Sequence, residues 1–259
     1  MRHPLETAVA VAAAVVAVAF GLSTYERWLR GRRRHELAWS AALAEFAVAA
    51  AALAAGAQAG WSGSTFRIFY LFGAVADVPV LALGTVYLLA GRRAGDRAAL
   101  GVALASTFAA GVVLSAPFHA AIPRDRLVQG SEVFGPLPRV LAAVGSAGGA
   151  IVIVGGALWS GWRVRRDGAP RRLLWSNGLI ALGTLVLGAS GALNSLFGAM
   201  TAFAVCLLAG IVVLFAGFLM ATAGSPAKRV IPPAPPWWPP GRPSGAGTPP
   251  GRQAATARP

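Results

Sequence analysis

The chain has 259 residues, of which 56% are hydrophobic and only 12% are charged, a composition outside the range of soluble globular proteins. Its formal net charge of +14 would suit a nucleic-acid-binding protein, but the basic residues lie between apolar segments and mark membrane topology, so we expect no nucleic-acid partner. The single cysteine excludes an internal disulfide and a CxxC redox pair.

Seven apolar segments follow one another along the chain, each close to the roughly 20 residues that cross about 30 Å of hydrocarbon. A single segment in a bilayer must satisfy its own backbone hydrogen bonds, so each segment is predicted to be an α-helix. The expected fold class is therefore an all-α membrane protein, a seven-transmembrane-helix bundle within residues 7–223. The segments cover residues 7–23, 37–58, 68–90, 98–116, 140–162, 173–193 and 201–223.

Basic residues are distributed unequally between the two sets of alternate connections. One set, together with the C-terminal region, holds 18 of the 23 Lys and Arg residues, and the other set holds five. Because Lys and Arg remain on the cytoplasmic side, we expect the N-terminus outside and the C-terminus in the cytoplasm. The expected location is the cell (plasma) membrane, and the expected partners are the lipid bilayer and anionic lipid headgroups at the cytoplasmic arginines.

Composition changes abruptly at the C-terminus, in residues 224–259, which hold eleven of the eighteen prolines. No apolar core can form there, so this region is predicted to be a disordered, basic, proline-rich cytoplasmic tail. Residues 232–240 include Trp237 and Trp238. They could be a polyproline II ligand for a protein partner, or a solvated segment whose tryptophans touch the bilayer surface.

Several classes of membrane protein are excluded by residues that the apolar segments lack. Retinal proteins need an intramembrane lysine, and the only lysine is Lys228 in the tail. Haem ligation between helices needs paired histidines, but His3 and His35 lie outside the segments and His119 lies at the edge of one. The same shortage leaves Ser190, in a GxSG pattern, without a histidine base. We therefore expect no enzyme activity, metal site or cofactor.

Small residues are predicted to let helices approach closely. Gly145, Gly149 and Gly156 lie on one face of the fifth apolar segment, and we assign them to helix packing, as we do the small residues around Ser190. The longest connection, residues 119–139, could cover an external mouth or serve only as a polar cap.

Two acidic residues, Glu45 and Asp77, lie deep inside the second and third apolar segments. At about 1.5 Å of rise per residue they are roughly 12 Å and 20 Å from the cytoplasmic helix ends. No lysine or arginine lies at similar depth, and a carboxylate without a counter-ion in a low dielectric is expected to be protonated. Tyr70 shares a helix face with Asp77, and Pro79 is expected to bend that helix.

Two interpretations of this candidate polar site remain open. In the structural one, the protonated acids hydrogen-bond to groups such as those of Thr184, Ser190 or Asn177 and hold helices together. In the functional one, the acids and Tyr70 line a hydrated cavity that binds a proton, a cation or a cationic solute.

Residues 66–93, FRIFYLFGAVADVPVLALGTVYLLAGRR, resemble segments of uncharacterised multipass membrane proteins of high-GC bacteria. No known activity comes with this resemblance, so it assigns no site residue. Our leading hypothesis is a non-enzymatic membrane protein, a structural or interaction component whose arginine-rich loops and tail engage lipid or a partner. The alternative is a small proton-coupled or cation/solute transporter that uses Glu45 and Asp77.

Overall fold

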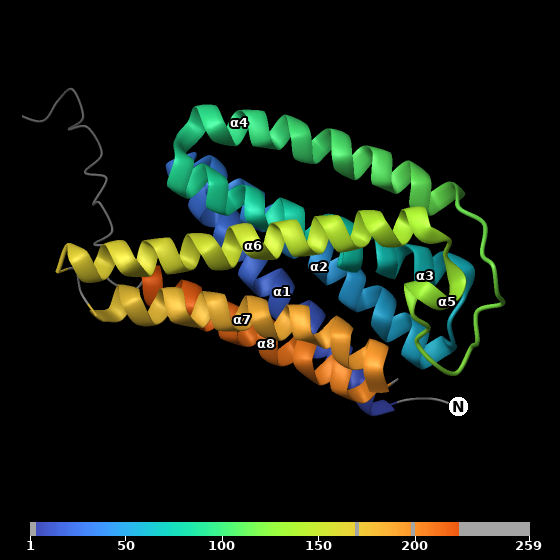
Figure 1. The fold of residues 1–259 in the computed structure, drawn as a ribbon. Coiled ribbons are helices and arrows are strands. Elements are labelled where there is room, and N and C mark those ends of the chain that lie inside the picture. The colour runs from blue at the N-terminus through green and yellow to red at the C-terminus, as the bar shows by residue number, and fades with distance from the viewer. Residues whose placement is uncertain (1–3, 169–170, 198–199, 223–259) are drawn as a thin grey trace, which may run out of the picture. The chain divides into compact units, whose positions relative to one another are not determined.

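A computed structural model describes residues 4–168, 171–197 and 200–222, and this part of the chain is helical and contains no β-strand (Figure 1). The expectation of an all-α protein is confirmed for these residues. The chain divides into a helical unit, Met1–Gly224, and a second unit, Ser225–Pro259. The predicted tail, residues 224–259, lies outside the described residues, and the fold below is that of the helical unit.

Six stretches of the described residues are helical, long and apolar enough to cross a membrane. The predicted third and fourth segments both fall within one of these, the 53-residue stretch Gly63–Ser115. The elements in chain order are α1 (Pro4–Gly31), α2 (Arg34–Ala59), α3 (Gly63–Phe69), the π-helix η1 (Tyr70–Ala76), α4 (Asp77–Ser115), α5 (Gly130–Val133), α6 (Pro136–Arg166), α7 (Arg171–Phe197) and α8 (Met200–Thr222).

The long helix α4 folds back on itself at Gly91, as Figure 1 shows. Gly91 has φ 79° and ψ −178°, a backbone conformation that glycine adopts without steric cost. The Tyr87 ring lies against Gly95, and the Tyr87 hydroxyl donates to Asp96 Oδ1 at 2.9 Å. Arg34, at the start of α2, also pairs with Asp96. Local contacts on both sides of Gly91 therefore hold this reversal.

The helices pack through faces rich in alanine and glycine. Contacts join α1 with α2 and α8, α4 with α2 and α6, and α7 with α6 and α8. One apolar core lies between α1, α2 and α8, where small side chains allow close approach and larger ones interdigitate. Its buried members include Ala13, Ala17, Phe20, Leu43, Phe46, Ile211, Leu214 and Phe218.

The glycine face predicted on α6 packs directly against η1 and α4. A Cβ atom on Gly145 would lie 3.0 Å from the Val75 carbonyl oxygen, and one on Gly149 would lie 2.8 Å from the Val78 carbonyl oxygen. The packing role predicted for this face is confirmed. For the small residues around Ser190 the outcome is divided: Ser190 is buried, whereas no described atom lies within 4 Å of the place that a Gly188 Cβ would occupy.

Residues 119–139 close the end of the bundle that carries α3 and α5. Four of their side chains are buried: Leu127, Val128, Val133 and Phe134. Beside them the Arg67 guanidinium donates to the carbonyl oxygens of Val113 and Ala116. These oxygens lie at the end of α4, where the helix supplies no further N–H donor. The guanidinium also lies over the Phe118 ring. This connection is therefore anchored by apolar contacts and is more than a polar cap.

Candidate functional site

The predicted site lies where a π-helix meets an α-helix. Asp77 is the first residue of α4, and its N–H donates to the Phe72 carbonyl oxygen five residues earlier. Such i→i+5 turns are rare and are frequent at functional sites. In this register the donor to the Ala74 carbonyl would be residue 79, a proline that has no N–H. The Ser146 hydroxyl of α6 takes its place and donates to the Ala74 oxygen at 2.7 Å.

Neighbouring helices hold the backbone around Asp77 closely. On one side, a Cβ atom on Gly73 would lie 3.2 Å from the Ala49 Cβ of α2. On the other side lie the glycines of α6 that pack against the main chain of η1 and α4. The position of the backbone that carries Asp77 is therefore set by contacts from two helices.

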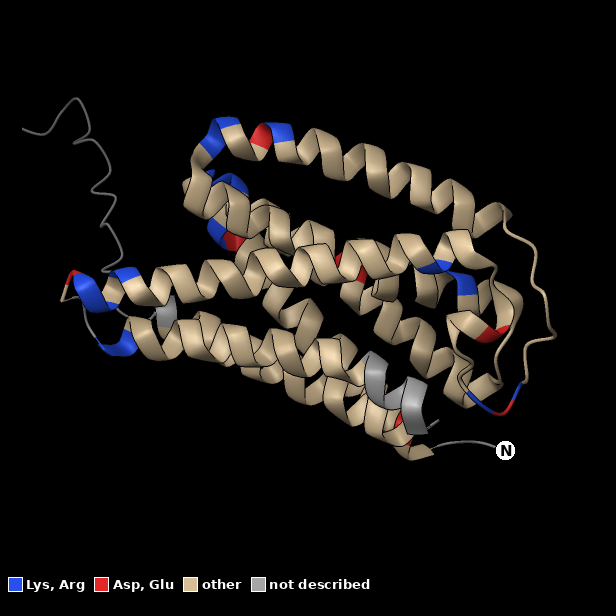
Figure 2. Cartoon of the chain, in the orientation of Figure 1, with Lys and Arg blue, Asp and Glu red and all other residues tan. Residues whose placement is uncertain are grey.

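The two predicted acids are brought together in the bundle. Asp77 is only 8% exposed, and Glu45 on α2 is half-buried with its Oε2 atom fully buried. Gly73 of η1 packs against Ala49 of α2, and each acid lies four residues from that contact, about one helical turn along the same helix face. Among the residues that the structure describes, neither Glu45 nor Asp77 has a hydrogen-bonding or ion-pair partner. Figure 2 shows acidic residues in the middle of the bundle as well as at its ends.

The polar groups proposed as partners for the acids are bonded elsewhere. Thr184 donates to the Ile180 carbonyl oxygen at 2.9 Å, and Ser190 donates to the Leu187 carbonyl oxygen at 2.6 Å. The Asn177 amide donates to Ser160 Oγ at 3.1 Å and so joins α7 to α6. The structure thus offers the acids none of the three interhelical hydrogen bonds that the structural interpretation named.

Tyr70 belongs to a different environment from the two acids. Its ring lies 5.0 Å from the Phe134 ring and 5.8 Å from the Phe66 ring, centroid to centroid. It is seven residues, or roughly 10 Å of helical rise, away from Asp77. In the described part of the chain no hydrogen bond links Tyr70 to either acid. Tyr70 therefore packs with the aromatic side chains near α3 and α5.

A third buried acid, Glu36, was missed by the sequence analysis. It is 2% exposed at the start of α2, and its Oε1 atom accepts from Arg27 Nη2 at 3.0 Å and from Nε at 3.2 Å. The Arg27 guanidinium also lies 4.8 Å from the centre of the Phe218 ring. Because Glu36 precedes the apolar segment by one residue, hydropathy assigned it to an exposed basic loop.

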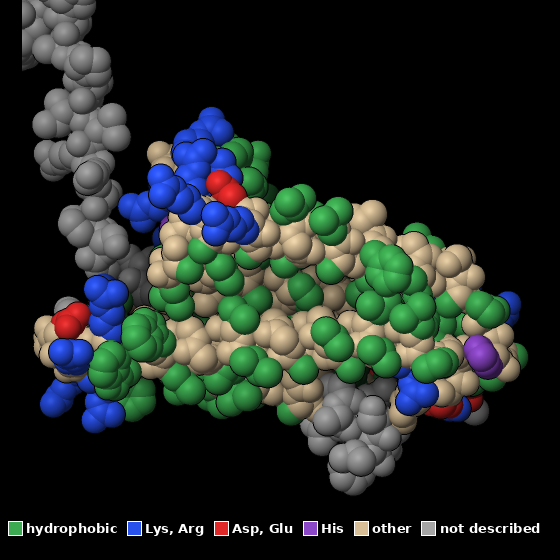
Figure 3. All heavy atoms as spheres, turned by 45° about the horizontal axis from the view of Figure 1, so that its top comes forward, with side chains coloured by type: hydrophobic (Ala, Val, Ile, Leu, Met, Phe, Trp, Pro, Cys, Tyr) green, Lys and Arg blue, Asp and Glu red, His purple; other side chains and the backbone are tan. Residues whose placement is uncertain are grey.

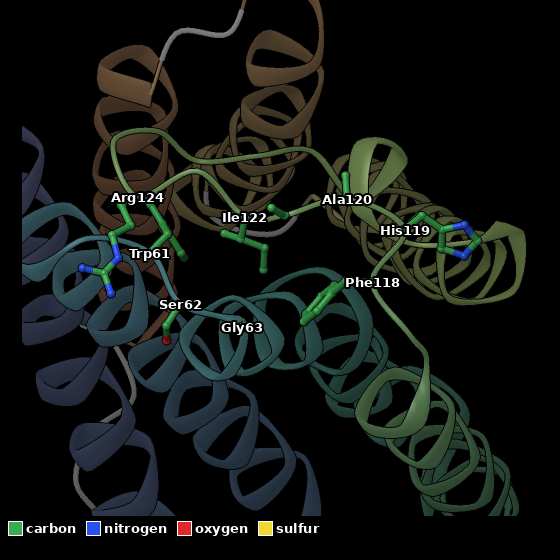
Figure 4. A pocket seen from close by; sticks show the side chains of 9 residues that line it. Trp61, Ser62, Gly63, Phe118, His119, Ala120, Ile122 and Arg124 are labelled. Atoms are coloured by element: carbon green, nitrogen blue, oxygen red, sulfur yellow. The ribbon is translucent and has the colours of Figure 1, made fainter.

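Two pockets lie away from the acid pair. The first, of about 550 Å³, is lined by the α2–α3 link and by residues 118–124, including Trp61, His119 and Arg124, and Figure 4 shows these side chains coming from the two segments. The second, of about 690 Å³, lies between α6 and α7. Neither is lined by Glu45 or Asp77. Among the described residues, no three His, Cys, Asp or Glu side chains gather to hold a metal ion.

Comparison with known proteins finds no matching protein-family model, no matching curated protein and no matching solved structure. The assignment of function therefore rests on the residues and geometry described above.

Proposed function

We propose that the chain crosses the bilayer seven times, with its N-terminus outside and its C-terminus in the cytoplasm. The stretch Gly63–Ser115 would be about 80 Å long as one straight helix, more than twice the thickness of the hydrocarbon. The reversal at Gly91 divides it into two parts, each long enough to cross. The 18-to-five distribution of basic residues favours the cytoplasmic side for this reversal.

Reporter fusions test this topology. A reporter after Ala223 and one between Arg92 and Arg93 are expected in the cytoplasm, and one within residues 194–200 is expected outside. Reporters after Ala223 and within residues 194–200 that read the same side would contradict an odd number of crossings. An external signal between Arg92 and Arg93 would contradict the orientation.

We infer that this membrane protein binds a proton or a small cation at Glu45 and Asp77 and moves it across the bilayer. The observation that carries the inference is that two buried acids, each one helical turn from the Gly73–Ala49 contact, have no cationic partner among the described residues. Two adjacent carboxylates in a low dielectric repel each other, and a cation or a bound proton relieves that repulsion. Intramembrane ionisable groups of this kind mark ion pathways.

The absence of satisfied hydrogen bonds argues against packing as the only role of the acids. A buried polar group that lacks a partner costs about 1–3 kcal/mol, so an acid kept for packing would be expected to bond to a neighbouring hydroxyl, amide or carbonyl. Glu45 Oε2 is buried and has no such partner in the part of the chain that the structure describes. The competing proposal, a structural or interaction component of the membrane, is supported by the basic residues, most of which lie at one end of the bundle and fewer at the other (Figure 2).

Ion flux in vesicles containing the full-length protein separates these roles. The variants are Asp77→Asn, Glu45→Gln and the double variant, since an amide keeps the shape and hydrogen-bonding capacity of the acid but does not ionise. Each single variant is expected to fold and to lose pH-dependent proton or cation flux, and the double variant should be no worse than either.

Glu26→Gln is the matched control, because Glu26 is exposed and its ion-pair partner among the described residues is the exposed Arg30. Its flux should equal that of the wild type. Wild-type vesicles without flux, or flux unchanged in both single variants, would refute transport by this pair and leave the structural role.

A further inference from the structure

A groove of about 690 Å³ lies between α6 and α7, at the end of the bundle where the chain passes from one helix to the other. Apart from Asn177 and the arginines its lining is apolar, with Leu158 and Gly161 from α6 and Leu174 and Gly178 from α7. Gly178 has no atom within 4 Å of its Cβ position, so the floor of the groove is open at this residue. The lining residues of α6 extend over roughly 14 Å of helical rise, room for part of an extended hydrocarbon chain.

Two tryptophans and two arginines lie at the mouth of this groove. Trp162 and Trp175 are 52% and 68% exposed, an arrangement suited to the boundary between hydrocarbon and headgroups. Arg165 and Arg166 lie beside them, and the Arg166 guanidinium is 5.5 Å from the centre of the Trp162 ring. Figure 3 shows large hydrophobic side chains next to basic ones at this end of the molecule.

The charge at the groove mouth is not neutralised by the described residues. The nearby Asp167 lies 3.7 Å from Arg163, and neither Arg165 nor Arg166 pairs with a carboxylate in the described part of the chain. A guanidinium group binds the oxygens of a phosphate with two parallel hydrogen bonds. The mouth therefore complements a phosphate group, and the apolar floor complements an alkyl chain attached to it.

We propose that this groove binds one anionic phospholipid, with its phosphate at Arg165 and Arg166 and one acyl chain between α6 and α7. A free phosphate would leave the apolar floor uncovered, and a lipid with no net charge would leave the arginines without a counter-charge. The inference does not depend on the acid pair, because none of the groove residues belongs to that site.

The headgroup part is tested by native mass spectrometry of the full-length protein in mild detergent, titrated with phosphatidylglycerol or phosphatidylcholine. One phosphatidylglycerol molecule should be retained in preference to phosphatidylcholine. Arg165→Gln/Arg166→Gln should weaken its binding by about tenfold or more. Arg93→Gln/Arg97→Gln removes the same charge from another exposed basic segment and should leave it unchanged. Arg165→Lys/Arg166→Lys keeps the charge but loses the two parallel hydrogen bonds, so it should bind phosphatidylglycerol more tightly than the glutamine pair and less tightly than the wild type.

The acyl-chain part is tested with a matched pair of glycines on α7. Gly178→Leu fills the floor of the groove and should weaken phosphatidylglycerol binding by about tenfold. Gly188→Leu adds the same side chain to another open position of that helix, outside the groove, and should have no effect.

Three results would overturn the proposal. Equal weakening by the two glutamine pairs would mean diffuse electrostatic attraction to the whole basic surface. Competition by glycerophosphoglycerol, the deacylated headgroup, at the same concentration as the lipid would mean a site for a free anion. Lipid retention that appears only after deletion of the residues beyond Lys228 would mean that the chain's own C-terminal region occupies the groove.

Discussion

Gly149→Ala, compared with Gly148→Ala, tests the packing that holds the backbone near Asp77. A Cβ atom on Gly149 would lie 2.8 Å from both the Cγ1 atom and the carbonyl oxygen of Val78, well inside ordinary van der Waals contact. Because one obstructing atom belongs to the backbone, α6 must move away from α4 by several tenths of an ångström. Such overpacking costs about 1–3 kcal/mol. Gly148 has nothing within 4 Å of its Cβ position.

Both substitutions gain the same helix propensity, about 1 kcal/mol for glycine to alanine, so their difference isolates the packing cost. Gly148→Ala should be neutral or stabilising by up to about 1 kcal/mol. Gly149→Ala should be less stable than Gly148→Ala by about 1–3 kcal/mol. The measurement is reversible unfolding in mixed micelles, followed by circular dichroism. Equal free energies of unfolding would show that α6 does not pack on α4 through this glycine face.

Three further predictions concern other parts of the chain. Arg27→Gln leaves the buried Glu36 without its cation, so it should destabilise the protein by roughly 2–4 kcal/mol in the same unfolding assay. Adding Glu36→Gln to this variant should restore most of the lost stability. The ion pair with Arg126 and a hydrogen bond from the Gln129 backbone amide lower the pKa of Glu132. The carboxylate of Glu132 therefore stabilises α5 fully above the ordinary glutamate pKa of about 4.3, and this stabilisation is lost as pH falls through the lower pKa of the folded protein. Hydrogen exchange of α5 should therefore accelerate only below about pH 4, weakly because the pair is exposed, and Glu132→Gln should abolish this acceleration. Deleting everything after Lys228 should leave membrane insertion and folding intact, and loss of the protein from the membrane fraction would contradict that.

Hydropathy was sufficient to predict the helices because in a bilayer length and apolarity determine the secondary structure. It also placed Glu45 and Asp77 deep in the bundle, since a charge inside an apolar segment is visible in sequence alone. The reversal at Gly91 was predicted as a polar connection between two segments. The contacts that hold it, Tyr87 against Gly95 and Arg34 with Asp96, bring together residues from two helices that sequence spacing does not relate.

The burial of Glu36 could not be predicted from hydropathy. An acid beside a run of arginines is predicted to lie in a solvated loop. In the structure the connection between α1 and α2 has only two residues, and it places Glu36 against Arg27. The pairing spans nine residues and depends on how α1 and α2 pack. A buried ion pair at a helix end therefore follows from tertiary structure and leaves little signal in composition.

The π-helix before Asp77 was not predictable for a related reason. Pro79 was expected to bend its helix, because a proline removes one backbone donor. The helix can either bend or widen into a π-turn, depending on which group donates a hydrogen bond to the carbonyl oxygen that the proline leaves without a donor. Here Ser146, 72 residues away, donates to the Ala74 oxygen. This interhelical hydrogen bond stabilises the i→i+5 register just before Asp77. The proline, the serine and the glycines of α6 thus act together, and the position of Asp77 depends on the contact between α4 and α6 as much as on the helix that carries it.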